Sequence, residues 1–299
     1  MHCDRLPRRV PRLSVSALGW PSCAAGKQEE SEALFVEILA KQRMLLGNND
    51  TSTLTTANNL AMSYTRRGAN AEAEPLMKMV YEARVKNPSL GERHQDTLLA
   101  LNNFASVLKA LGKFAESEKC YRKALAHRRE IMGPAAKATL NSMNNLAVVI
   151  VAQAEAAETL GDEEQAAEKY DEAGKLLAEA YEGLKLAYGA THKDTISMFN
   201  NYTVMMFNHG QQEKAIQTAR ALLEECKEGA KEADSAQRRS MTEQTRWSTE
   251  DAAEPVEYAS EKDLKKIANH LHNLLVGTQE DSYVEEAEQL KADNPQLFA

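Results

Sequence analysis

Pairs of adjacent asparagines recur four times inside expected helices of this chain of 299 residues. An amide side chain carries an acceptor oxygen and two N–H donors, so it can bond to both the C=O and the N–H of an extended peptide. Asparagine is otherwise unfavourable inside a helix, because its side chain competes for backbone hydrogen bonds. The pairs therefore indicate recognition of a peptide backbone or bonds to neighbouring helices. They are Asn58-Asn59, Asn102-Asn103, Asn144-Asn145 and Asn200-Asn201.

Other chemistry is weakly represented. The sequence contains no G-x-x-x-x-G-K-[ST], no H-E-x-x-H and no G-x-S-x-G motif. His270 and His272 are two residues apart on an expected helix, so their side chains diverge and cannot chelate a metal together. The four cysteines form no C-x-x-C pair, and we interpret them as free thiols. We expect no enzymatic activity, no cofactor and no metal.

The composition favours an all-α protein, with 14 glycines, 8 prolines and 6% aromatic residues. The net charge is −8, but residues 1–26 carry four arginines against one aspartate, which leaves −11 on the rest. An acidic body argues against a nucleic-acid partner. The sequence has no apolar run near the ~18 residues that a membrane span needs.

The asparagine pairs belong to a longer repeat. A threonine lies five residues before each pair, and a glycine follows nine residues after most pairs, at Gly68, Gly112 and Gly210. Between these marks the sequence predicts a helix, a glycine turn and a second helix, with Asp96 and Asp194 among the expected helix caps. The threonines are Thr53, Thr97, Thr139 and Thr195, at spacings of 44, 42 and 56 residues.

The third unit is longer than the others. From Asn145 to Gly161 is 16 residues where the other units have nine, and its second helix is also longer by seven. Seven residues are about two helical turns, or ~10 Å, so each helix keeps its buried face. We predict a hairpin over residues 148–188 that projects beyond its neighbours.

The units divide the chain into four expected parts. Residues 1–26 form a disordered basic tail, although their arginines leave organelle targeting open. Residues 27–227 hold a half repeat and four repeats, of which the third is elongated. Residues 228–260 form a polar inserted loop, and residues 261–299 a divergent last repeat and the C-terminus.

The stretch HQDTLLALNNFASVLKALGKFAESEKCYRKALAHRREIMGPAA resembles the 42-residue tetratricopeptide repeats of kinesin light chains. The resemblance covers residues 27–295 and includes the polar insertion before the last repeat. It implies a right-handed superhelix of helix-turn-helix repeats and a scaffold that binds cargo peptides with an aromatic residue flanked by acids. It also implies a cytoplasmic, cytoskeleton-associated protein. Kinesin heavy chain would be a partner, but the heptad segment through which light chains bind it is missing here.

A helical wheel of the second unit places Leu101, Ala105 and Leu108 toward the second helix, and Asn103 away from them. The first helices of stacked hairpins line the concave surface. We therefore expect the second asparagine of each pair, with other residues of the same face, to line a peptide-binding groove. The candidate residues are Asn59, Asn103, Asn145, Asn201, Arg66, Lys109, Val148, Val204 and Phe207.

Three alternatives remain open. The asparagines could bond to neighbouring helices, and the valines could contact the adjacent repeat. The chain could instead be an assembly module that associates through its elongated third hairpin. Trp247, which Glu250 and Asp251 follow closely in the expected loop, could occupy the groove as an internal pseudo-ligand or pack against the last repeat.

Overall fold

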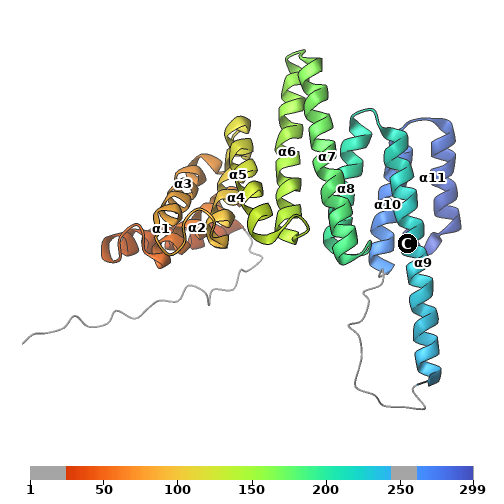
Figure 1. Cartoon of the computed structure of the whole chain (residues 1–299), viewed down its shortest axis with the longest axis horizontal. Coiled ribbons are helices and arrows are strands. Elements are labelled where there is room, and N and C mark those ends of the chain that lie inside the picture. The colour runs from red at the N-terminus through yellow and green to blue at the C-terminus, as the bar shows by residue number, and fades with distance from the viewer. Residues whose placement is uncertain (1–24, 244–260, 299) are drawn as a thin grey trace, which may run out of the picture. The chain divides into compact units, whose positions relative to one another are not determined.

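The computed structural model describes residues 25–243 and 261–298, which form helices and turns and contain no β-strand (Figure 1). The expected all-α repeat fold is therefore confirmed. Trp247 and residues 1–24 of the predicted basic tail lie outside the described residues. The chain divides into two compact units, residues 1–112 and 113–299, which we describe separately.

The first unit contains α1 (Ala25–Leu45), α2 (Thr51–Arg66), α3 (Asn70–Lys86) and α4 (Gln95–Ala110), each packed against the next. Small residues let these helices approach closely. Ala57, Ala61 and Ala73 are fully buried at the crossings, beside larger apolar side chains. The apolar residues around them are Leu39, Leu54, Leu60, Met77, Val80, Ala100 and Val107.

A polar contact joins α1 to the end of α2. Glu32 is only 6% exposed, yet Ser63 Oγ donates to its carboxylate at 2.7 Å and Arg67 Nε lies 2.9 Å from it. The guanidinium of Arg67 also lies over the ring of Tyr64, 4.9 Å from its centroid. A buried carboxylate needs such partners, because desolvation of an unpaired charge is costly.

The second unit contains the four helices of repeats three and four, preceded by α5 (Phe114–Met132). The four are α6 (Lys137–Thr159), α7 (Glu163–Tyr188), α8 (Lys193–Asn208) and α9 (Gln212–Glu243). The remaining helices are α10 (Glu261–Gly277), α11 (Asp281–Asp293) and the short α12 (Pro295–Phe298). Helices α5 to α9 each pack on the next, α9 packs on α10, and α10 also contacts α8, α11 and α12.

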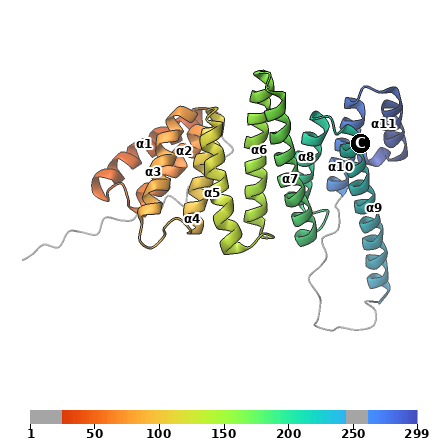
Figure 2. The ribbon, with the colours of Figure 1, turned by 45° about the horizontal axis from the view of Figure 1, so that its top comes forward.

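The α6–α7 hairpin is longer than its neighbours. Helix α6 has 23 residues, against 16 in α2, α4 and α8, and α7 has 26 residues, against 19 in α5. Each helix therefore gains seven residues, and Figures 1 and 2 show the tip of the hairpin rising past the end of α8. The turn at the tip places Gly161 at φ 78°, a conformation that suits glycine.

The threonines that mark the repeats are all 0% exposed. In the third repeat, Thr139 Oγ1 donates to Gly133 O at 2.8 Å and so ties the start of α6 to the preceding turn. The expected caps Asp96 and Asp194 are wrong. Nδ1 of His94 and of His192 accepts from the backbone N–H two residues later at 3.2 Å, which makes the histidines the N-caps.

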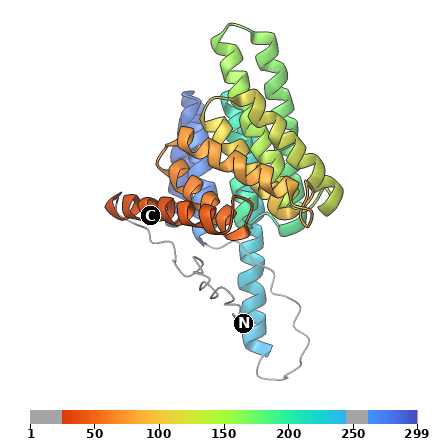
Figure 3. The same cartoon turned by 90° about the vertical axis from the view of Figure 1, so that its left-hand side faces the viewer.

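The predicted start of the inserted loop at residue 228 is also wrong. Helix α9 continues to Glu243, and Figures 1 and 3 show its last turns running past the ends of α8 and α10. The physical reason is visible in its sequence, KEGAKEADSAQRRSMTE, which has no proline and is rich in alanine, glutamate, lysine and arginine. These residues have high helix propensity, so the polar composition does not end the helix.

Ion pairs join the second helices of successive repeats. Arg122 Nη2 lies 2.6 Å from Glu172 between α5 and α7, and Lys185 Nζ lies 2.6 Å from Glu225 between α7 and α9. Exposed pairs of this kind each contribute about 0–1 kcal/mol, so most of the stability comes from the apolar core.

A substitution at Gly183 in α7 would test how closely α6 and α7 pack in this core. A Cβ at this position would lie 2.7 Å from Leu140 Cδ2 of α6, and Leu140 is 2% exposed and cannot easily move. We expect Gly183→Ala to lower the melting temperature, because overpacking costs about 1–3 kcal/mol and exceeds the ~1 kcal/mol gained in helix propensity.

Gly229 in α9 is the matched control, since a Cβ there would meet nothing within 4 Å. Gly229→Ala should raise the melting temperature, measured by circular dichroism at 222 nm. Equal shifts for the two variants would contradict close packing of α6 against α7.

Candidate functional site

The second asparagine of each pair lies on a first helix at a position that is not fully buried. Asn59 of α2, Asn103 of α4 and Asn145 of α6 are half-buried, and Asn201 of α8 is exposed. Nearby positions on the other face, such as Leu60, are buried. Each of these helices thus has one partly exposed face that carries an amide, as the helical wheel predicts.

One of these amides also bonds to a neighbouring repeat. Asn201 Nδ2 donates to Asn144 Oδ1 at 2.9 Å, which links α8 to α6. The second asparagine of the fourth repeat therefore pairs with the first asparagine of the third. In the first unit, Asn58 Nδ2 lies 3.5 Å from Met62 Sδ within its own helix. Packing between helices thus accounts for part of the repeated pattern.

The basic candidates lie in the first unit. Arg66 is exposed at the end of α2, and Lys109 is half-buried in the last turn of α4. Arg67, one residue further on, pairs with the carboxylate of Glu32 and lies over the ring of Tyr64.

The apolar candidates lie in the second unit. Val148 is half-buried and Val204 is 43% exposed, so both contribute apolar surface to the first-helix faces of α6 and α8. Phe207 is half-buried against α10, where a Cβ on Gly277 would lie 3.0 Å from Phe207 Cζ. Phe207 therefore packs against the last repeat.

The contact of α8 with α10 also includes a half-buried histidine, His270. Thr203 Oγ1 donates to Phe199 O at 2.8 Å, so it accepts from His270 Nε2 at 2.7 Å, which places the ring proton on Nε2. The imidazole meets the ring of Phe199 edge-on, with centroids 5.4 Å apart. Burial lowers the pKa of His270, because an imidazolium would lose its hydration here.

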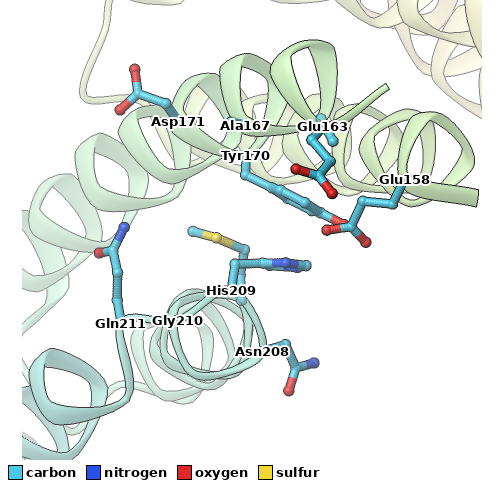
Figure 4. Close-up of a pocket in the computed structure, with 11 residues that line it drawn as sticks. Glu158, Glu163, Ala167, Tyr170, Asp171, Asn208, His209, Gly210 and Gln211 are labelled. Atoms are coloured by element: carbon cyan, nitrogen blue, oxygen red, sulfur yellow. The ribbon is translucent and has the colours of Figure 1, made fainter. Parts of the chain in front are cut away.

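A pocket of about 500 Å³ lies where the tip of the α6–α7 hairpin meets the α8–α9 turn (Figure 4). One wall of the pocket contains the ring of Tyr170, which stacks on His209 with centroids 3.4 Å apart and planes inclined by 25°. The hydroxyl of Tyr170 donates to Glu158 Oε2 at 2.9 Å. The pocket is lined by Glu158, Glu163, Ala166, Ala167, Tyr170, Asp171, Met205, Asn208, His209, Gly210 and Gln211.

Two pKa shifts define the charge of this pocket. Burial lowers the pKa of His209 despite the opposing effect of Glu158 and Glu155, so the imidazole is neutral at pH 7. Burial and the hydrogen bond to Glu158 raise the pKa of Tyr170, so its hydroxyl remains a donor. The formal charges that face the pocket are therefore carboxylates.

Sequence reasoning missed this pocket, because its residues come from turns and helix ends and match no motif. The usable signal is the elongation of the third hairpin. Seven extra residues in each helix carry Glu158 and Tyr170 beyond the core of the repeats, to the level of the turn that contains His209.

None of the groups of histidine, cysteine, aspartate and glutamate within residues 30–231 and 262–298 has the arrangement of a metal site. The described helices also include none that combines the length and the hydropathy needed to cross a membrane.

Comparison with known proteins supports the repeat assignment. Tetratricopeptide repeat models match residues 53–87 and 96–158. The TPR-like repeats of a candidate kinesin light chain from Podosopora anserina superpose with a TM-score of 0.55 and 19% identity, covering 66% of this chain and 85% of that chain. BtubC (BKLC) from P. vanneervenii superposes with a TM-score of 0.55 and 16% identity, covering 91% and 92%. A sequence comparison with curated proteins gives no match.

These comparisons concern the fold. The chain contains tetratricopeptide repeats, and its solved structural neighbours include kinesin light chain-like repeat proteins. The predicted resemblance to kinesin light chains is therefore confirmed at the level of the repeat fold.

His270 gives a prediction on pH dependence. Its pKa is lowered in the folded chain, so unfolding takes up a proton, and the stability fully present above about pH 6.5 falls as the pH drops below that value. We expect His270→Gln to lower the melting temperature at pH 7.5, since it loses packing on Phe199, but to flatten its decline between pH 7.5 and 5.5.

Thr203→Val is the control, because it removes the hydrogen bond and leaves the imidazole in its contact with Phe199. This variant should keep the steep decline. His209 contributes in the same direction, so part of the dependence should survive in His270→Gln. An unchanged slope in His270→Gln would contradict the assignment.

Proposed function

We propose that this protein is a non-enzymatic interaction scaffold that binds extended peptide segments of partner proteins on the faces of its first helices. The observation that carries the proposal is the recurrence of one partly exposed amide at the same position of four first helices. Tetratricopeptide repeats and the kinesin light chain-like fold support the scaffold role. Peptide binding, a cargo-carrying role and a cytoplasmic location go further and are part of the proposal.

Asparagine side chains suit this function because they can bond to both the C=O and the N–H groups of a ligand's backbone. The side chains of Asn59 and Asn103 each carry a C=O acceptor and two N–H donors, which match the alternating C=O and N–H groups of an extended peptide. Asn201 uses one of its N–H groups in the bond to Asn144. The same side chain thus joins α8 to α6 and also lies on the exposed first-helix face of α8.

The neighbouring side chains would supply specificity. Arg66 and Lys109 in the first unit favour acidic residues in the ligand, and Val148 and Val204 in the second unit favour apolar residues. Acidic residues of a ligand therefore suit the first unit, and an aromatic or other apolar residue suits the second.

The test is the affinity of a fluorescein-labelled nonapeptide with a central tryptophan flanked by glutamates, measured by fluorescence anisotropy on the full chain. We expect Asn59→Ala combined with Asn103→Ala to weaken binding about tenfold or more, since each lost hydrogen bond is worth about 1 kcal/mol.

Asn269→Ala is the matched control, because this exposed amide donates to Lys265 O of its own helix α10 and lies on no first-helix face of the four pairs. It should leave the affinity unchanged. If the asparagine variants fold normally and bind the peptide as well as the parent chain does, the first-helix faces are not the ligand site.

Assembly through the elongated hairpin is a second candidate function, and one observation favours it. Leu160 at the tip of the hairpin is 86% exposed and so offers apolar surface that a partner could cover. If the chain associates through this tip, Leu160→Glu should reduce the mass measured by light scattering at high protein concentration. An unchanged mass over a hundredfold range of concentration would exclude this role.

A further inference from the structure

We propose that the pocket between the tip of the α6–α7 hairpin and the α8–α9 turn binds the guanidinium group of an arginine side chain from a partner protein. The site lies wholly in the second unit and does not use the asparagine pairs. The inference therefore stands independently of the proposed function.

The charged side chains that line the pocket are all acidic. Among the 11 lining residues, all within the described part of the chain, three are carboxylates and none is lysine or arginine. Asp171 already pairs with Lys175 at 2.6 Å on the outer face of α7. The negative charge that faces the pocket is therefore carried by Glu158 and Glu163, and Figure 4 shows both on the side where the hydroxyl end of Tyr170 lies.

Glu158 is held in position by its neighbour. The Tyr170 hydroxyl bonds to Oε2 of Glu158, so the carboxylate is oriented before any ligand arrives, and the bond takes only one of its oxygens. A preoriented carboxylate binds a cation at a lower cost in conformational entropy than a mobile surface glutamate does. Glu163, in the first turn of α7, provides the second carboxylate.

The aromatic wall favours a flat cation. Tyr170 and His209 form a stacked pair that is polar at its edge and apolar at its face, and His209 is neutral because burial lowers its pKa. A guanidinium group stacks on such rings and donates several N–H bonds in one plane to carboxylates, whereas an ammonium group cannot do both. These features assign the site to arginine over lysine.

The floor and rim fit the three-carbon stem of arginine. Met205 Cε would lie 3.2 Å from a Cβ on Gly174, so the absence of a side chain there lets the methionine settle between α7 and α8. Ala166, Ala167 and Met205 supply apolar surface, while Asn208 and Gln211 supply amides at the rim. A cavity of about 500 Å³ accommodates one such side chain with the adjoining backbone and some water.

A metal ion is a poorer occupant. The pocket offers carboxylates from two helix ends, but the described residues contain no group of three ligands with the proximity that a metal needs. A divalent cation also requires six or more oxygen ligands or retained waters, which two carboxylates do not provide.

The experiment is a titration of the full ¹⁵N-labelled chain with the pentapeptide Gly-Gly-Arg-Gly-Gly at physiological salt. The readout is the backbone amide of Gly210, which lines the pocket, with the amide of Gly91 in the first unit as an internal reference. We expect the amide resonance of Gly210 to shift saturably with peptide concentration and the amide resonance of Gly91 to stay in place. The same peptide with citrulline, which keeps the shape and loses the charge, should bind at least tenfold more weakly, and the lysine peptide several-fold more weakly.

Variants distinguish binding in this pocket from nonspecific attraction of the cationic peptide to an acidic protein. Glu163→Gln, which breaks no hydrogen bond of the folded chain that we describe, should weaken binding about fivefold, and Glu158→Gln should weaken it at least as much. Glu168→Gln, an exposed carboxylate of α7 outside the pocket, should have no effect. Equal binding of the citrulline or lysine peptide, or an equal loss in Glu168→Gln, would overturn the proposal.

Discussion

The constraint on which this structure depends is that no helix pair of the chain can bury its apolar residues alone. Each helix has its buried side chains on faces that only the neighbouring helices can cover, as Ala57, Leu60 and Val80 show in the first unit and Leu140, Ile150 and Leu177 in the second. Small residues at the crossings set the distances between helices, and Gly183 is the extreme case. The outer faces are consequently free to vary, which is where the candidate binding residues lie.

The repeat architecture was predictable because it follows from local sequence. The threonines are buried at equivalent positions, so their spacing reports the length of each unit, and the extra seven residues in both α6 and α7 follow from the same count. The end of α9 was not predictable in the same way. A polar segment can be a loop or an exposed helix, and composition alone does not distinguish them until helix propensity is considered residue by residue.

The candidate site was only partly accessible from sequence, because a helical wheel gives direction and no partner. It placed Asn59, Asn103 and Asn145 on partly exposed faces, but it could not show that Asn201 meets Asn144. Phe207 shows the same limit, since its contact with Gly277 joins residues that are seventy positions apart. The stack of Tyr170 on His209 likewise depends on how two hairpins are placed, which no local pattern encodes.

The elongated hairpin also bears on the order in which the chain folds. Contacts between residues close in sequence form fastest, and a longer hairpin has more of them for the same loop of a few residues between α6 and α7. In a repeat protein, folding can begin at the most stable unit and spread to its neighbours. We therefore expect α6 and α7 to be the nucleus of the second unit, onto which α5 and α8 then dock. The amides of their buried turns should exchange with deuterium last, and those of α11 and α12 first.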